Sequence, residues 1–152
     1  MSQNDKKSPQ YIIGSRHAGL TLLSSIKGYA SVLQKNIAGE MSDAHRKALQ
    51  VIFDCCETPW ESWWDISELI EKNDDEKVIE ILNQEDNTGK SYLERNFIAT
   101  SIASMDVAIK YSSAILREAE QLSNDQRKFI EIIDNNCKRE IDVLKEIAEY
   151  FS

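Results

Sequence analysis

The chain of 152 residues has little of what marks several common classes of protein. It contains three cysteines, two histidines, two prolines and five glycines, and its formal net charge is −8 at pH 7. No cluster of Lys and Arg stands out, so nucleic acid is not an expected partner. No run approaches the roughly 20 apolar residues of a membrane span, and the N-terminus lacks the apolar core of a signal peptide. We therefore expect a cytoplasmic protein without membrane insertion.

The cysteines and acids form no pattern that is typical of a metal or catalytic site. Cys55, Cys56 and Cys137 have neither CxxC spacing nor histidines nearby, so we expect no metal, and nothing indicates a cofactor. Reduced cysteines are usually small core residues, and only Cys55, if exposed, would be a reactive thiol. No carboxylate pair, nucleophile triad or nucleotide phosphate cradle emerges, so an enzyme with an active site of its own is not indicated.

What the sequence does contain is helical periodicity. Pro9 suits the start of a first helix and Gly39 its end. Its apolar stripe is Ile12, Leu22, Ile26, Tyr29, Leu33 and Ile37. Ser42 is a suitable N-cap for a second helix, which Pro59 should kink just before the tryptophans. That second stripe is Leu49, Ile52, Phe53, Cys56, Trp60, Trp63, Ile66 and Ile70.

Two more helices follow an acidic segment. Residues 73–90 are expected to be a linker with room for a short helix around Lys77 to Leu82. The third stripe is Ile98, Ile102, Met105, Ile109, Ser112 and Leu116. Ser123 and Gln126 then have the spacing of a capping box. The fourth stripe is Ile130, Ile133, Cys137, Ile141, Leu144, Ala148 and Phe151, and Glu140 stands where the second helix has Pro59. The fourth helix should therefore be straight.

The second pair of helices repeats the first. MSDAHRKALQVIFDCC (residues 41–56) matches LSNDQRKFIEIIDNNC (122–137) at an offset of 81, and IKGYASVL (26–33) matches IKYSSAIL (109–116) at an offset of 83. Two hairpins, 9–72 and 91–152, each have an apolar face that they cannot bury alone. We expect an all-α fold, in which these tandem hairpins pack as an antiparallel four-helix bundle with a pseudo-two-fold axis, after a flexible N-terminus at 1–8.

Helical geometry predicts which residues face solvent. At about 100° per residue, His17 lies about 200° from Ser15 and Gly19, which extend the core stripe, so it should face water. Further residues fall on the same outward line and would let another protein's helix approach closely: Thr21, Ser24, Gly28 and Ser31. His45, in the first turn of the second helix, is expected to be solvated and without a role. Trp64 lies at the edge of the core face, where an exposed tryptophan would anchor a partner.

The segment RHAGLTLLSSIKGYASVL, followed by AGEMSDAHRKALQVI, resembles the dimerisation and histidine phosphotransfer (DHp, HisKA-type) hairpin of sensor histidine kinases. The family motif reads H-E-L-R-T-P-L-x-S-I-x-G-Y. By position, His17 falls on the phospho-accepting histidine and Thr21 on a polar residue that the family associates with dephosphorylation. The chain departs from the motif where the acid, the arginine and the proline are replaced by Ala18, Leu20 and Leu22. The likeness covers most of the first hairpin and extends weakly to the second, where the alignment makes Thr100 the counterpart of His17.

The resemblance implies a two-component signalling module that binds a response regulator receiver domain or a sensor kinase. The family's ATP-binding domain is absent, so we do not expect an autonomous kinase. A histidine with an ordinary pKa near 6.5 is neutral enough to accept phosphate from an energised donor, which makes phosphotransfer through His17 the expected chemistry. The alternative is an inert scaffold or decoy that binds through the same face or through Trp64. We expect a monomer, with a hairpin-swapped dimer as the alternative.

Overall fold

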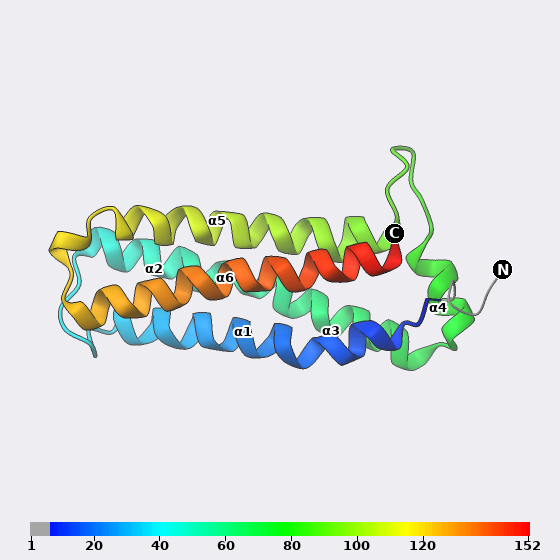
Figure 1. Ribbon diagram of the computed structural model, residues 1–152, viewed down its shortest axis with the longest axis horizontal. Coiled ribbons are helices and arrows are strands. Elements are labelled where there is room, and N and C mark those ends of the chain that lie inside the picture. Colours follow the sequence, from blue (N-terminus) through cyan, green and yellow to red (C-terminus); the bar gives the residue numbers. More distant parts are fainter. Residues whose placement is uncertain (1–6) are drawn as a thin grey trace.

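The computed structural model describes residues 7–152, which are almost entirely helical (Figure 1). The predicted flexible N-terminus, residues 1–8, lies mostly outside the described residues. The α-helices are α1 (Gln10–Gln34), α2 (Asp43–Cys55), α3 (Glu57–Lys72), α4 (Asp75–Leu82), α5 (Ala99–Leu116) and α6 (Asn124–Phe151). Within 7–152 there is no β-strand, only an isolated bridge between Glu85 and Ser91. The all-α prediction is confirmed, and no described helix is both long and apolar enough to span a membrane.

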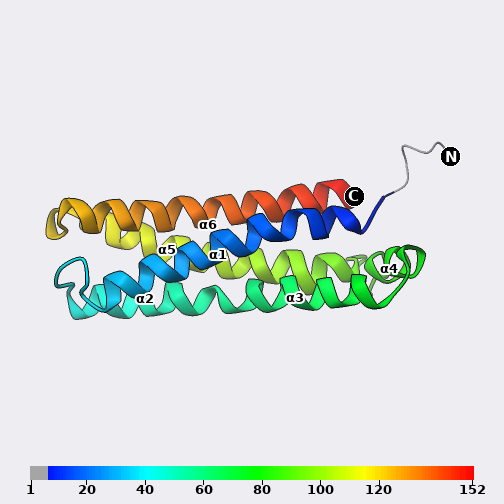
Figure 2. The same ribbon diagram turned by 90° about the horizontal axis from the view of Figure 1, so that it is seen from below.

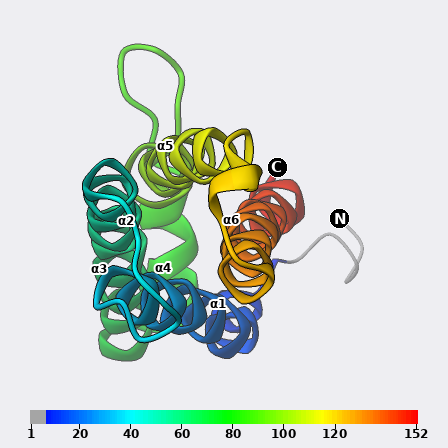
Figure 3. The same ribbon diagram turned by 90° about the vertical axis from the view of Figure 1, so that its left-hand side faces the viewer.

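The long helices lie side by side around one core (Figure 3). α1 packs against α6 on one side and against α2 and α3 on the other, and α5 contacts the same neighbours from the opposite corner. Figure 2 shows the start of α1 and the end of α6 at the same end of the molecule. There the rings of Tyr11 and Tyr150 stack with centroids 4.0 Å apart, and the Ser8 amide donates to the Tyr150 hydroxyl over 2.9 Å. These contacts tie the N-terminal end of α1 to the last turns of α6.

Helix α1 ends earlier than the sequence indicates. The predictions that it ends at Gly39 and that Ile37 belongs to the core stripe are wrong, because α1 stops at Gln34 and Ile37 is 69% exposed. Asn36 adopts a left-handed backbone with φ of 60°, and the amides of Asn36 and Ile37 donate back into the last turn of α1. This is a Schellman motif, in which asparagine takes the place usually held by glycine.

The second helix of the first half, formed by α2 and α3, differs in shape from that of the second half, α6, as predicted. The first half has a break at Cys56, between α2 and α3, and Pro59 lies in the first turn of α3. Proline has no amide hydrogen and its ring crowds the preceding turn, which disfavours a continuous helix through this point. In α6, Glu140 stands 81 residues after Pro59 and the helix runs without interruption.

Both second helices begin with the serine caps that the sequence predicts. The Ser42 hydroxyl accepts from the His45 amide over 3.1 Å, and Ser123 accepts from the Gln126 amide over 3.1 Å. In the second case, the Gln126 side chain also accepts from the Ser123 amide over 2.9 Å, which completes a capping box. These caps satisfy amides at the ends of helices that would otherwise lack partners.

Buried positions recur between the two halves, but at two offsets. In α6 they fall 81 residues after those of α2 and α3, as the sequence match predicts: Leu49 and Ile130, Ile52 and Ile133, Cys56 and Cys137, Trp63 and Leu144, Ile66 and Ile147. In α5 they fall 82 residues after those of α1, not 83: Gly19 and Ser101, Leu23 and Met105, Ile26 and Ala108, Ala30 and Ser112, Leu33 and Ile115. The positional counterpart of His17 is therefore Ala99, and not Thr100.

The register of α5 differs from the sequence match because its buried positions hold small residues. Small residues such as Ser101 and Ala108 occupy its buried positions, whereas Ile102 and Ile109 are half-buried on the flank, so the apolar stripe appears one residue too late. The sequence offsets of 83 and 81 predict a connection between α5 and α6 that is two residues shorter than the one in the first half. Because the offset in the structure falls only from 82 to 81, the connection is one residue shorter.

The segment 73–90 contains a helix that belongs to the core. The Asp74 carboxylate caps α4 by accepting from the Lys77 amide over 2.8 Å, and Val78 and Leu82 are fully buried in the core cluster. After α4 the chain forms a loop that projects from the end of the molecule (Figure 1). The α4 helix therefore closes one end of the bundle, while the following loop lies in solvent.

Candidate functional site

His17 lies on the outward face of α1. Its side chain is exposed, and the buried residues Ile12, Gly19 and Leu23 lie on the opposite side of the helix. The outward line that the sequence predicts has Thr21, Ser24 and Gly28 exposed and Ser31 half-buried. A Cβ atom built on Gly28 would meet nothing within 4 Å, so the surface is open at this point. The imidazole is accessible to a partner.

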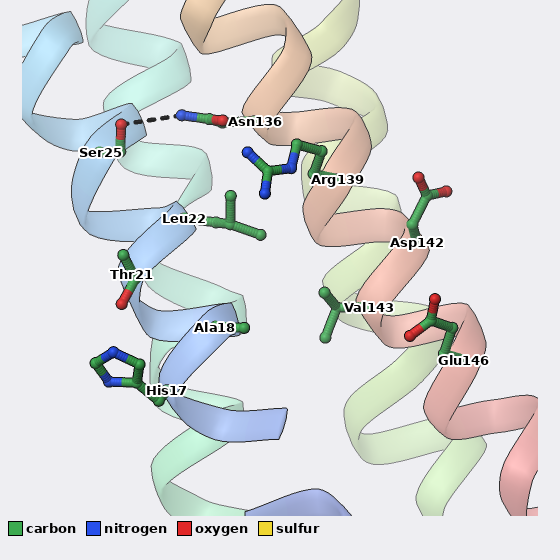
Figure 4. Close-up of a pocket in the computed structure, with 10 residues that line it drawn as sticks. All are labelled: His17, Ala18, Thr21, Leu22, Ser25, Asn136, Arg139, Asp142, Val143 and Glu146. Atoms are coloured by element: carbon green, nitrogen blue, oxygen red, sulfur yellow. Dashed lines mark hydrogen bonds between the residues drawn. The ribbon is translucent and has the colours of Figure 1, made fainter. Parts of the chain in front are cut away.

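Beside this line, α1 and α6 enclose an open cavity of about 490 Å³ (Figure 4). Its lining from α1 is His17, Ala18, Thr21, Leu22 and Ser25, and from α6 it is Asn136, Arg139, Asp142, Val143 and Glu146. The Asn136 side chain donates to the Ser25 hydroxyl over 2.9 Å and links the two helices at one end of the cavity. In Figure 4, His17 and Thr21 lie on the side of α1 away from α6, so they form the rim of the cavity.

The second half of the chain supplies the charged side chains of this cavity. Arg139 extends from α6 toward α1 in Figure 4, and Asp142 and Glu146 line the cavity farther along α6. Within residues 7–152, Arg139 forms no ion pair. These three residues cannot be recognised from the sequence, because each has the pattern of an ordinary exposed charge on a helix. Only the contact between α1 and α6 brings them to His17.

A buried polar contact lies behind His17, in the core. Gly19 leaves room for Trp63, because a Cβ atom at Gly19 would lie 2.3 Å from the indole ring. The Trp63 Nε1 donates over 3.0 Å to Oε2 of Glu140, and both side chains are fully buried. The other oxygen, Oε1, has no partner within the described chain. Burial raises the pKa of Glu140 to about 8, and the Trp63 hydrogen bond opposes that shift only in part. The carboxyl is therefore mainly neutral at pH 7.

Glu140 is a core residue that was not predicted from the sequence. It does lie on the stripe of α6, three residues after Cys137 and immediately before Ile141, so its spacing alone indicates burial. An acid on such a stripe is unusual because an unpaired buried charge is costly. The burial of Glu140 is explained by Trp63, whose N–H group needs an acceptor. Because Trp63 belongs to the other half of the chain, the local sequence around Glu140 does not reveal this contact.

The prediction that His45 is solvated is wrong. His45 is 5% exposed, and its Nε2 lies 3.7 Å from Oε1 of Glu118, in the connection between α5 and α6. Its counterpart Gln126 is also buried, and its side chain donates over 3.1 Å to the Glu40 carbonyl, in the connection between α1 and α2. Each first turn is thus covered by the connecting loop of the other half, a contact that hydrophobic periodicity does not reveal.

The cysteines are unsuited to reactivity. Cys56 and Cys137 are buried, and burial raises the pKa of both thiols, that of Cys56 to about 12. Cys55 is half-buried, and burial together with the Asp54 charge raises the pKa of its thiol. The thiolate form, which is the nucleophile, is therefore disfavoured at all three positions.

Trp64 does not line the cavity beside His17. Its side chain is 46% exposed, as the sequence predicts for the edge of the core face. The Arg16 guanidinium lies 5.2 Å from the centroid of the Trp64 ring and pairs with Glu71, with 3.3 Å between Nη1 and Oε1. The structure brings His17, Thr21, Ser24, Gly28 and Ser31 together along α1, whereas Trp64 belongs to α3 and lies against Arg16.

No group of His, Cys, Asp and Glu side chains within residues 7–152 could hold a metal ion. Comparison with models of protein families, with curated proteins and with solved structures finds no match to this chain. The functional assignment therefore depends on the residues and the geometry described above.

Proposed function

We propose that this protein is a two-component signalling module built as a single-chain, pseudo-dimeric DHp-like bundle. The hairpins at residues 9–72 and 91–152 would be its two halves. Three observations support this proposal: the buried positions repeat at offsets of 82 and 81, α1 and α5 occupy opposite corners, and each half covers the first capped turn of the other. A bundle of this kind mimics within one chain the symmetry of a homodimer. The three cysteines, which form no disulfide, suit the cytoplasm.

In this proposal, His17 accepts a phosphoryl group from a receiver domain. The ring nitrogen without a proton attacks the phosphorus of a phospho-aspartate, and a nitrogen–phosphorus bond forms. The bond from phosphorus to the aspartate oxygen breaks, and its electron pair leaves with the carboxylate. The proton on the other ring nitrogen stays or passes to water. The observation that carries the assignment is an exposed histidine at the rim of a cavity where the two halves meet.

The other predicted residues have supporting roles. Thr21 lies one turn after His17 on the same cavity rim, where its hydroxyl can orient a water that removes the phosphate. Ser24, Gly28 and Ser31 continue the outward line with small side chains, which lets a helix of the receiver domain approach α1 closely. Transfer suits the site better than kinase activity, because Ala18 beside His17 cannot accept a proton.

The second candidate function is an inert scaffold or decoy that binds a receiver domain or a kinase without phosphate transfer. One observation favours it. Within the described residues, no side chain hydrogen-bonds to His17, so nothing holds the imidazole in one orientation. Phosphotransfer enzymes usually orient their histidine through such a contact. Binding through the exposed face of α1, or through Trp64, requires no such orientation.

Phosphate transfer from receiver domains tests the proposal. The purified protein is incubated with receiver domains of the same genome that carry labelled phosphate, and acid-labile, base-stable label on the protein is measured. We expect label on the native protein and none on His17→Gln. The matched control is His45→Gln, which installs the residue that the counterpart position, Gln126, already carries and should keep the label. Label that persists in His17→Gln would overturn the site, and absence of label with every receiver domain would favour the scaffold.

The oligomeric state tests the pseudo-dimeric arrangement separately. If each half already provides the partner of the other, the protein should be a monomer in solution. Light scattering during size-exclusion chromatography measures this directly. A stable dimer would show that hairpins pair between chains, with the segment 73–90 connecting two bundles.

A further inference from the structure

A second surface lies where α1 meets α2 and α3, and its aromatic rings are covered by cations. The Lys27 ammonium lies 5.1 Å from the centroid of Phe53 and 5.5 Å from that of Trp60. The Arg16 guanidinium covers Trp64 in the same manner at 5.2 Å. We call these five residues the aromatic seam. Cations over ring faces gain from the negative charge of the π-system, so each ring of the seam already binds a cation.

Exposed carboxylates surround the aromatic seam. They are Asp54, Glu57, Glu61, Asp65, Glu68 and Glu71. Glu71 pairs with Arg16 and Glu68 with Lys72, whereas the others have no ion pair within the described residues. Asp54, Glu57 and Glu61 line a hollow of about 270 Å³ together with Lys27, Phe53 and Trp60. The seam thus has aromatic surface, local negative charge and room beside the rings.

The second half of the chain lacks this surface. At the positions 81 residues later, Ile141 replaces Trp60, and Lys145 and Lys138 replace Trp64 and Glu57. The two halves use the same buried positions, so packing of the bundle does not require an exposed tryptophan bordered by acids. A large apolar side chain left 46% exposed is informative, since aromatic residues dominate the energy of protein interfaces.

We propose that the aromatic seam binds a basic helical segment of a partner protein. Arginine or lysine side chains of that segment would displace Arg16 and Lys27 from the rings and pair with the free carboxylates. Charge complementarity selects this occupant, because the six carboxylates around the seam outnumber its two cations and the whole chain has a net charge of −8. A second copy of the chain would carry the same negative charge and is therefore disfavoured. The proposal does not depend on phosphate transfer through His17.

Two synthetic peptides test the inference on the full chain. One is an alanine-rich helical peptide with arginine at every fourth position, and the other has glutamine at those positions. Binding is followed by titration, and amide chemical shifts locate the contact. We expect the arginine peptide to bind and to shift signals of Arg16, Lys27 and Trp64, while the glutamine peptide does not bind. Failure of the arginine peptide to bind, or shifts that centre on α5 or α6, would overturn the inference.

Matched variants separate the aromatic seam from general attraction to an acidic protein. Trp64→Ala should weaken binding about tenfold, whereas Tyr111→Ala, which removes another exposed aromatic ring, should leave it unchanged. Glu57→Gln with Glu61→Gln should weaken binding at least about fivefold, and the same change of charge on α6, Glu131→Gln with Glu149→Gln, should have little effect. If a seam variant and its matched control lost the same amount of peptide affinity, binding would not be specific to the aromatic seam. All the substituted side chains are exposed, so the fold should be retained, as circular dichroism can verify.

Discussion

The two halves of the molecule share a buried framework and differ at the surface. Their core positions correspond at offsets of 82 and 81, and both second helices begin with a serine cap. On the outward side, the first half carries His17 and Trp64 where the second half has Ala99 and Lys145. The buried positions therefore correspond between the halves, whereas exposed positions such as these differ. The residues that distinguish the halves at the surface are therefore where function should be sought.

The halves also differ at one place in the core. Gly19, Trp63 and Pro59 of the first half correspond to Ser101, Leu144 and Glu140 of the second. Trp63 fills the space beside Gly19 and donates to Glu140, so the contact requires different residues from the two halves. A symmetric pair of identical hairpins would lack it. This contact therefore makes the two halves unequal in the core.

The largest expected effect is a dependence of stability on pH. It arises from Glu140, because its counterpart in the first half, Pro59, has no ionisable side chain. The pKa of Glu140 is about 8 in the folded protein, against an ordinary value of 4.5. Between these values, the folded state holds a proton that the unfolded state has lost. The free energy of unfolding should therefore fall as pH rises from about 4.5 to 8 and then level off. At about 1.4 kcal/mol per unit, the total loss is roughly 3 to 5 kcal/mol.

Denaturant unfolding of the native protein and of Glu140→Gln at several pH values checks this expectation. The amide keeps the acceptor for Trp63 but cannot ionise, so the variant should lose most of the fall in stability. The exposed control Glu149→Gln should behave like the native protein. Parallel pH profiles for the native protein and Glu140→Gln would contradict the assignment of a neutral, buried carboxyl.

A smaller effect is expected for the counterparts Gly19 and Ser101. Gly19→Ala places a Cβ atom 2.3 Å from the buried ring of Trp63, and such overpacking should cost about 3 kcal/mol. Ser101→Ala instead removes a buried hydroxyl that has no hydrogen-bond partner within the described chain, and should stabilise the fold by about 1 kcal/mol. Thermal and denaturant unfolding measure both changes. Similar effects for the two variants would show that the two halves do not differ here.

The fold could be predicted from the sequence wherever local chemistry determines it. The spacing of apolar residues in α2, α3 and α6 marks their buried faces, Pro59 marks the break, and Ser123 with Gln126 marks a cap. The register of α5 could not be read in this way, because small residues such as Ser101 fill its buried positions. Hydrophobic pattern identifies a buried face only when large apolar residues occupy it.

The candidate site could be predicted only in part, for a related reason. The outward direction of His17 follows from helical geometry within α1. The burial of His45 and the approach of Arg139 to the cavity depend on contacts with the other half of the chain. The hydrogen-bond acceptor of Trp63 is likewise distant, because Glu140 lies 77 residues away in the sequence. A single sequence gives no measure of such distant contacts.

The central claim is that the first half has an accessible phospho-accepting histidine, and direct labelling tests it without any partner. The chain has two histidines, His17 exposed and His45 buried, so each is an internal control for the other. Phosphoramidate, a small donor that phosphorylates histidine, is added to the folded protein, and the products are read by phosphorus NMR and peptide mass spectrometry. We expect one phosphohistidine, at His17, which disappears in His17→Gln. Phosphate on His45, or a protein that stays unlabelled, would contradict this claim.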